Sequence, residues 1–450
     1  MRRVLFVLMF VLCISLVLFS HKDCYSAGYA LIEQGVSGLG NAYAGGAASA
    51  LDATTIFYNP AGITRFNYPQ IIGAGHVIIP SAKFTNEGST HILQSKTGIP
   101  LRGDNGDDAG VTAFVPNLYF SMPLNNKLFF GVGIYSPFGL ETNYGSTWVG
   151  RYHAIKSNMM TINVNPTISY KVTENLSLGL GISGQYIKAE LTNAIDFGTM
   201  DALGVFAPIR IGLTPQMADG FAKLKGDGWG VGFNIGALYE FTKDTRIGVS
   251  YRSRIKQKLS GDAEFSNVPS ALSPLPVFKN GGIKADITLP DSLSASLYHN
   301  INEKWAVMGD VTWTGWRTFD ELRIRFDNPA QADAVTTTKW KNSMRYSLGV
   351  SFKPIDSLTL RTGVAYDETP IPDALHRTPR IPDTDRTWIA FGAGYKLTER
   401  INIEGGYVHI FFREAFTDKN PVGEDAVRGG LKGSYKGHVD IVSLQLTYRF

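Results

Sequence analysis

The feature that most constrains this 450-residue chain is a two-residue alternation of apolar with small or polar side chains, which begins near Gln70 and continues to the C-terminus. Between Leu176 and Ser183, leucine and isoleucine occupy one face, and serine and glycine occupy the other. The same pattern recurs in residues 233–241, 344–352 and 358–366. Alternation with this period predicts β-strands that have two unlike faces.

The unlike faces favour a barrel in a membrane over a soluble sandwich. Many of the apolar faces end in aromatic residues, as interfacial girdles do; examples are Tyr170, Tyr239, Tyr251, Tyr366 and Tyr448. The opposite faces carry small and polar groups, which suit a wet or plugged lumen better than a packed core. Beyond the N-terminus, no stretch is long and apolar enough for a membrane-spanning helix. We therefore expect an all-β fold, a transmembrane antiparallel β-barrel.

The first residues have the order of a secretory signal peptide. Two arginines precede the apolar run from Val4 to Phe19, which is shorter than the roughly 20 residues of a spanning helix, and small residues follow it. We predict a signal peptide over residues 1–26, with cleavage after Ser26 or, alternatively, after Ala27. Both cysteines of the chain lie within it, so the mature protein is expected to carry no thiol.

Two further units are expected after the signal peptide. Residues 27–68 are rich in small side chains, show no sustained alternation and are predicted to form a compact, irregular N-terminal unit that can pack inside a narrow space. Within it, Asn59 suits a helix cap and Pro60 suits the first helical position. Residues 69–450 are predicted to form the barrel. Short turns are expected at 171–175 and 241–244, and long external loops at 193–228, 266–282 and 370–385.

The sequence argues against most other classes of function. Its 43 basic and 39 acidic residues give no basic surface for nucleic acid. It has no Gly-x-Ser-x-Gly elbow, phosphate loop or His-Glu-x-x-His motif, and the glycines of 179–184 lie in a strand pattern without a following helix. We expect no enzyme, hence no catalytic residue, no metal and no cofactor. A barrel hydrolase with a distant Ser/His pair is the alternative.

Two groups of residues are candidates for ligand contact. The expected loop 193–228 is unusually apolar and includes Phe197 and Phe206, so it either binds a ligand or packs on itself as a lid. Basic residues also gather on faces predicted to be lumenal, where they could hold a carboxylate or form salt bridges with acidic neighbours. These are Arg252, Arg254, Lys256, Lys258, Arg345 and Arg361.

Several motifs together resemble one family. The N-terminal motifs are Ala27-Gly28-Tyr29, Ser37–Gly40, Ala42–Gly45 and Asn59-Pro60-Ala61, followed by Pro116-Asn117, Tyr135–Leu140 with Phe138, Ile381–Arg386 and the terminal Tyr448-Arg449-Phe450. They are similar to motifs of the FadL-type outer-membrane transporters of long-chain fatty acids and other hydrophobic compounds. The resemblance covers essentially the whole predicted mature chain, and the N-terminal block is its most specific part.

The resemblance implies a Gram-negative outer-membrane barrel of about fourteen strands. It implies passive transport: external loops capture a hydrophobic molecule, the lumen binds it, and a gap in the wall releases it sideways. Residues 27–68 would be an N-terminal hatch inside the lumen. Asn59, Pro60 and Ala61 would belong to the part of the hatch that faces the gap, and Ala113 and Ser136 would line the gap. Pro116 and Pro137 each remove a ladder donor from a strand-like segment, which would interrupt pairing there.

Partners and cargo follow from the same resemblance. Phe138 and Asn193 join the candidate ligand residues, the C-terminal Phe450 would be read by the barrel-assembly machinery, and a monomer surrounded by outer-membrane lipid is expected. Family members that carry fatty acids have basic residues at the positions aligned with Asn193 and near Thr336, and both are neutral here. The cargo is therefore either a fatty acid held by other cations or a neutral, for example aromatic, hydrocarbon. A structural or adhesive barrel is the alternative from another class.

Overall fold

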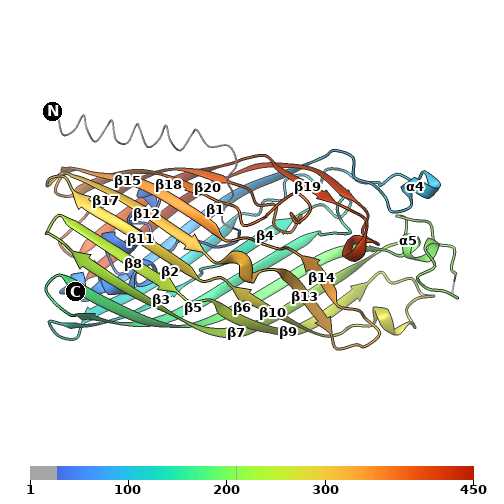
Figure 1. The fold of residues 1–450 in the computed structure, drawn as a ribbon, viewed down its shortest axis with the longest axis horizontal. Helices are drawn as coiled ribbons and strands as arrows, with labels where there is room; N and C mark the ends of the chain where they lie inside the picture. Colours follow the sequence, from blue (N-terminus) through green and yellow to red (C-terminus); the bar gives the residue numbers. More distant parts are fainter. Residues whose placement is uncertain (1–27, 209) are drawn as a thin grey trace.

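The computed structural model describes residues 28–208 and 210–450; the predicted signal peptide lies outside these residues. The described chain forms one antiparallel sheet that closes into a barrel, because β1 pairs with β2 on one side and with β20 on the other (Figure 1). Twenty strand segments make up fourteen wall strands, since six wall strands are each interrupted once. The predicted all-β antiparallel barrel is confirmed.

Eight wall strands are uninterrupted: β1 (Gln70–Asn86), β2 (Ala113–Pro123), β5 (Lys156–Lys171), β6 (Leu176–Asp196), β7 (Asp219–Glu240), β16 (Leu358–Asp367), β17 (Arg386–Lys396) and β20 (Leu431–Arg449). Six consist of two segments: β3 (Leu128–Tyr135) with β4 (Gly139–Asn143), β8 (Thr245–Arg252) with β9 (Ile255–Ser266), β10 (Gly281–Leu289) with β11 (Ser292–Asn300), β12 (Trp305–Thr314) with β13 (Glu321–Phe326), β14 (Ala334–Thr337) with β15 (Ser343–Ile355), and β18 (Ile401–Phe412) with β19 (Ala415–Lys419).

The two faces of the wall differ as the alternation predicts. On β6, Leu178, Leu180 and Ile182 are exposed on the outer surface, whereas Ser177 and Ser183 are buried toward the lumen. An apolar outer face and a polar inner face are what a membrane barrel requires, because lipid surrounds the wall. None of the helices in the described part of the chain is long and apolar enough to cross a membrane.

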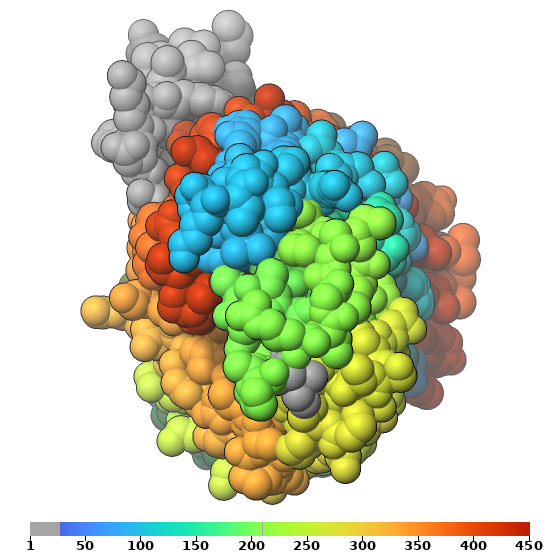
Figure 2. Space-filling model, turned by 90° about the vertical axis from the view of Figure 1, so that its right-hand side faces the viewer, coloured from blue at the N-terminus to red at the C-terminus, as the bar shows by residue number. Residues whose placement is uncertain are grey.

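One end of the barrel has short turns and the other has long loops, which carry α4 (Gln94–Thr97), α5 (Phe197–Ala202), η3 (Pro276–Phe278) and η5 (Gly423–Asp425). A further short helix, η4 (Trp316–Thr318), lies in the interruption between β12 and β13. Figure 2 looks onto the loop end, where the blue loop after β1 and the green loop after β6 lie side by side. They are joined by a 2.7 Å hydrogen bond from the Arg102 amide to Gln216 Oε1. The loop end is the external side, as in other bacterial barrels.

The apolar loop is shorter than the expected range 193–228. Strands β6 and β7 stay paired as far as Asp196 and Asp219, so the loop itself covers only 197–218. Its side chains pack on each other and on the loop after β9: Phe197, Phe206 and Phe278 are buried in one cluster. Of the two interpretations of this loop, the structure shows the self-packed one.

The N-terminal segment, residues 28–68, packs against the inner faces of the wall strands. It contains η1 (Leu39–Asn41), α2 (Gly46–Ser49), α3 (Thr55–Tyr58) and η2 (Pro60–Arg65), which contact β15 to β18, β8 and β11, β3, and β5 to β7 respectively. The approach is close: a Cβ atom on Gly248 of β8 would lie 1.8 Å from the Ala47 carbonyl oxygen. Small residues on both partners let the segment fit inside.

Candidate functional site

The wall has a gap in its pairing between β2 and the strand formed by β3 and β4. Residues Ala113–Asn117 pair with β1, but their other edge has no partner, because the β2–β3 ladder begins only at Leu118. An isolated bridge between Gly110 and Thr142 closes the gap on the external side. We call this stretch, 111–117 opposite 135–141, the side gap. Ala113 and Pro116 lie on one edge of it, and Ser136 and Pro137 on the other.

The β3–β4 strand turns inward at the side gap and pairs with the N-terminal segment. The Leu31 amide donates to the Pro137 carbonyl at 2.9 Å, and the Gly139 amide donates to the Tyr29 carbonyl at 3.1 Å. Ala30 forms an isolated bridge with Phe138. Residues 29–31 therefore act as a short inner strand that satisfies backbone groups which the wall leaves unpaired.

A cavity of about 690 Å³ runs through the side gap, and we call it the gap cavity. Ala113, Pro116 and Ser136 line it. So do Phe114, Met160 and Ile162, which are exposed on the outer surface, and Tyr29 and Asp383 from the interior. Its size is within the usual range of about 300–1,000 Å³ for small-molecule sites. It thus links the barrel interior to the lipid-facing surface.

Tyr29 is held in an aromatic cage above this cavity. Its ring centroid lies 4.7 Å from Trp316, 5.6 Å from Trp340 and 6.1 Å from Phe138. Gly28 precedes it with φ of 63°, and a Cβ there would lie 2.8 Å from the Trp340 ring, so only glycine fits. The Gly28 amide donates to Asp383 Oδ2 at 2.9 Å. The start of the described chain is thus fixed by packing and by a carboxylate.

A second cavity, the loop cavity, lies on the external side of Tyr29 and is apolar. Most of its lining comes from aliphatic side chains of seven wall strands, including Leu140, Met159, Leu191, Leu224, Leu259, Ile283 and Ile324. It shares Tyr29, Leu140, Met159 and Ile381 with the gap cavity. Tyr29 therefore stands between the two cavities.

Two cations, Lys225 and Arg380, are among the residues that line the loop cavity. Lys225 pairs with Glu190 at 3.5 Å, whereas Arg380 reaches the cavity from the loop between β16 and β17. Its guanidinium makes long hydrogen bonds to neutral groups: 3.1 Å to the Ser157 hydroxyl, 3.3 Å to the Lys156 carbonyl and 3.5 Å to Asn193 Oδ1. Among the described residues no carboxylate lies within 4 Å of it. Burial lowers the pKa of the Arg380 guanidinium to about 9, which still leaves it charged at neutral pH. A guanidinium has five donors, so capacity for an anion remains.

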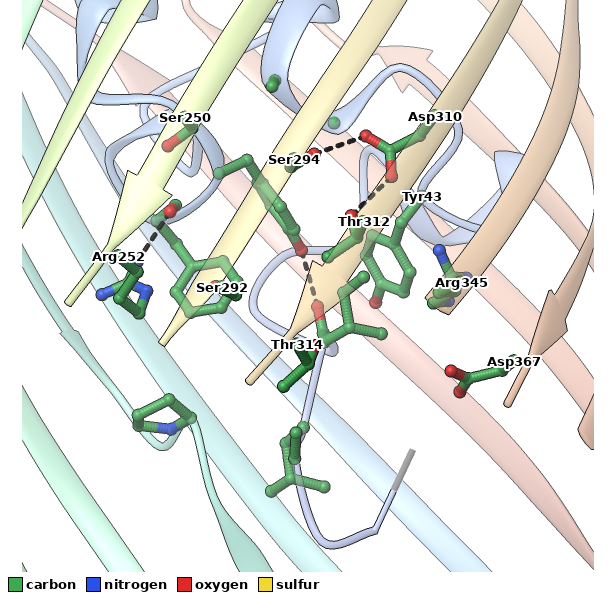
Figure 3. A pocket seen from close by; sticks show the side chains of 18 of the residues that line it. Tyr43, Ser250, Arg252, Ser292, Ser294, Asp310, Thr312, Thr314, Arg345 and Asp367 are labelled. Atoms are coloured by element: carbon green, nitrogen blue, oxygen red, sulfur yellow. Dashed lines mark hydrogen bonds between the residues drawn. The ribbon is translucent and has the colours of Figure 1, made fainter. Parts of the chain in front are cut away.

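A third cavity lies between the N-terminal segment and strands β8, β11, β12 and β15 (Figure 3). Its wall side is lined by hydroxyls and by Asp310, which accepts 2.7 Å hydrogen bonds from Ser294 and Thr312. Arg252 donates to the Phe57 carbonyl at 2.7 Å, and Arg345 donates to the Ala42 carbonyl at 2.7 Å. These two predicted lumenal cations therefore bind the N-terminal segment.

The prediction that Arg254, Lys256 and Lys258 share the lumenal face with Arg252 is wrong. The interruption between β8 and β9 shifts the alternation by one residue at Ser253, so that Ile255 points inward. Arg254 is 51% exposed and pairs with Asp291 at 3.0 Å on the outside. Arg361 does point inward, but it forms a buried ion pair with Glu404, as the salt-bridge interpretation of these cations expects.

Asn59, Pro60 and Ala61 are buried against β5, β6 and β7 and do not line the gap cavity, so they do not face the gap as expected. Asn59 Nδ2 donates to the Ala47 and Ala237 carbonyls at 2.6 and 2.9 Å, and its Oδ1 caps η2 through the Ala61 amide. This geometry anchors the segment to the wall. Phe138 lies in the cage of Tyr29, whereas Phe197 and Phe206 belong to the loop cluster and line none of the three cavities.

The sequence prediction missed Arg380, Tyr29 and the cage tryptophans. Asn193 is neutral where fatty-acid members of the family that the sequence resembles have a basic residue. The structure places Asn193 beside Arg380, whose positive charge comes from another loop. The sequence did point toward Arg380, because this residue directly precedes Ile381–Arg386, one of the motifs on which the family resemblance rests. Among residues 28–208 and 210–450, no group of three or more His, Cys, Asp or Glu side chains is arranged so that it could hold a metal ion.

Comparisons with known proteins agree with this architecture. Residues 17–450 match the family described as outer membrane protein transport protein (OMPP1/FadL/TodX). The long-chain fatty acid transport protein of Escherichia coli O6:H1 is 33% identical, with 86% of this chain and 88% of that protein covered. Outer membrane protein P1 of Haemophilus influenzae is 30% identical, with 94% and 95% covered.

Solved structures show the same fold. A FadL homologue from Pseudomonas aeruginosa superposes with a TM-score of 0.84 at 25% identity, covering 94% of this chain and all of that one. The toluene transporter TodX of Pseudomonas putida gives 0.67 at 19% identity, with 94% and 99% covered. The chain belongs to the OMPP1/FadL/TodX family of outer-membrane transport proteins.

Proposed function

We propose that this protein carries long-chain fatty acids, or closely similar amphipathic carboxylates, across the outer membrane by passive diffusion. The observation that carries the proposal is Arg380, a guanidinium that faces an apolar cavity without a described carboxylate partner. The loop cavity, of about 90 Å³, would take part of an acyl chain, and each buried methylene would contribute about 0.8 kcal/mol. Its carboxylate would neutralise Arg380 through a charge-assisted hydrogen bond.

A neutral hydrocarbon fits this site less well. It would cover the aliphatic lining but leave the guanidinium without a counter-charge in a low-dielectric cavity, which is costly. The relatives of at least 30% identity include proteins named as long-chain fatty acid transporters, and the toluene transporters share the fold at lower identity. Both considerations favour the fatty acid over the hydrocarbon.

Release is proposed to occur sideways, through the side gap. Cargo in the loop cavity adjoins Tyr29, so displacement of residues 28–31 would join the loop cavity to the gap cavity. The gap cavity opens between outward-facing apolar side chains such as Phe114 and Met160. A sideways exit keeps an apolar chain out of bulk water, where its transfer is unfavourable.

The test is uptake of radiolabelled oleate and of toluene into cells that lack their own transporter, with and without this protein. We expect the protein to accelerate oleate uptake. A gain with toluene alone would replace the fatty acid by a hydrocarbon as cargo. No gain with either compound, with the folded barrel shown at the cell surface, would favour a structural or adhesive role.

A further inference from the structure

The two edges of the side gap are joined through one side chain of the N-terminal segment, that of Gln34. It is fully buried. Its Nε2 donates to the Ser136 carbonyl at 2.7 Å on the β3–β4 edge, and its Oε1 accepts from Asn117 Nδ2 at 2.8 Å on the β2 edge. A second donor bond runs from Nε2 to the Leu31 carbonyl at 3.0 Å. One amide thus spans a stretch where the wall has no ladder.

The backbone of Gln34 is fixed to the same edge of the wall. The hydroxyl of Tyr119, two residues along β2 from Asn117, donates to the Gln34 carbonyl at 2.7 Å. Asn117 and Tyr119 are both almost fully buried. Water cannot readily replace a bond lost in such surroundings, so each lost partner leaves an unsatisfied polar group.

We propose that Gln34 is the latch of the side gap, a positioning residue that holds Asn117 and Ser136 at their present separation. The latch is carried by the segment that also contains Tyr29. Cargo that displaces residues 28–31 also displaces Gln34. When Gln34 leaves its position, both edges of the side gap lose their connection in one step. Arrival of cargo and widening of the gap are therefore coupled. This inference rests on the proposed sideways release.

The chain offers a matched control. Gln445 on β20 is almost as completely buried as Gln34, and it also joins the wall to the N-terminal segment. Its Oε1 accepts a 2.8 Å hydrogen bond from the Val36 amide, and its Nε2 donates a 2.7 Å hydrogen bond to Asp52. It lines none of the gap cavity. A third bond runs from Gln445 Nε2 to the Thr447 hydroxyl at 3.4 Å, so Gln445→Leu removes as many side-chain hydrogen bonds as Gln34→Leu without touching the side gap.

The experiment compares full-length Gln34→Leu, Asn117→Leu, the double variant and Gln445→Leu in proteoliposomes, with heat-modifiable electrophoresis to confirm folding. We measure the rate of oleate transfer into the bilayer, the equilibrium affinity for oleate, and hydrogen–deuterium exchange of residues 135–140. The first two variants should transfer oleate about 3- to 10-fold faster, the range one hydrogen bond contributes to an equilibrium. Oleate affinity should rise by no more than the same factor, because cargo that favours the open gap binds more tightly once the latch is weakened. Exchange should rise, and Gln445→Leu should resemble the parent protein.

Since Gln34 links the two edges, the double variant should be no faster than Gln34→Leu alone. Additive effects, or a Gln445→Leu variant that accelerates transfer equally, would overturn the latch in favour of general loosening. Faster exchange at 135–140 without faster transfer would leave the latch standing and overturn the sideways exit. If Gln34→Leu does not fold, Gln34→Glu serves instead, because it keeps the acceptor for Asn117 and removes both donors.

Discussion

Replacing Arg380 by methionine should separate fatty acids from neutral compounds of the same shape. The methionine keeps an unbranched apolar stem in the loop cavity and removes the charge. A hydrogen bond to a charged group contributes about 1.5–3 kcal/mol. Oleate should therefore bind about 10- to 150-fold more weakly to Arg380→Met. Methyl oleate, which has the same chain and no charge, should bind the variant at least as tightly as the parent protein, because no guanidinium is then left without a counter-charge.

The assay is equilibrium binding of radiolabelled oleate and methyl oleate to the barrel in nanodiscs. Arg380→Lys is the matched control, since it keeps the positive charge but loses the planar guanidinium with its paired donors. It should retain part of the preference for oleate over methyl oleate. The pKa of Arg380 adds a second expectation. Because that pKa lies at about 9, oleate affinity should hold between about pH 6 and pH 8 and decline above about pH 9.

The reasoning would be refuted by an equal loss of affinity for oleate and methyl oleate, which would mean that Arg380 only shapes the cavity. It would also be refuted by an unchanged oleate affinity in a variant that is shown to be folded. The second check is necessary because Arg380 hydrogen-bonds the Lys156 and Thr192 carbonyls, so its removal also loosens the loop. A melting temperature for each variant separates the two effects.

Three further predictions concern the N-terminal segment and the loops. Gly28→Ala places a Cβ 2.9 Å from Trp316 in a left-handed conformation that costs about 1–2 kcal/mol; entry of a hydrophobic dye into cells should rise, and unchanged entry would contradict the gating role of this strand. Asn59→Ala removes three buried hydrogen bonds, so the free energy of unfolding should fall by about 2–4 kcal/mol in thermal denaturation, with no change expected in oleate affinity. Burial lowers the pKa of His153 in the loop after β4, so this histidine binds a proton more readily in the unfolded loop than in the folded one. The folded loop should therefore become less stable, and less protected against proteolysis, as the pH falls below about 6.5. His153→Gln should remove this pH dependence.

The sequence could predict most of the wall because the alternation is a local property. In a strand that lipid surrounds, successive side chains point alternately outward and inward, so apolar residues alternate with polar or small ones. Leu178 and Leu180 lie on the outer face, as this alternation predicts. The prediction failed where a strand is interrupted. A single extra residue at Ser253 reverses the faces of everything beyond it, and Arg254 consequently points outward. No periodic pattern marks such an interruption in advance.

The candidate site was harder to predict, because its parts come from distant places in the chain. Arg380 and Asn193 are 187 positions apart, yet their side chains are in contact. The neutral Asn193 left the cargo open because a family's charge was sought at one aligned position. A carboxylate cargo, as we propose, requires only that some cation reaches the cavity, and Arg380 comes from a loop far along the chain. Gln34 carries no local pattern at all, since its role depends on two strands that it bridges.

The inner strand explains why the side gap can be closed at rest. Backbone groups that face lipid without partners cost several kcal/mol each, so an interrupted wall strand must find partners elsewhere. Here the break turns inward, and Tyr29 and Leu31 supply the missing acceptor and donor to Gly139 and Pro137. Removing residues 28–31 without replacement would expose these groups. Opening is therefore unfavourable in the empty protein. Under the sideways release that we propose, cargo in the cage of Tyr29 would offset this loss by burying its own apolar surface. The residues that complete the wall would then also be those that respond to the cargo.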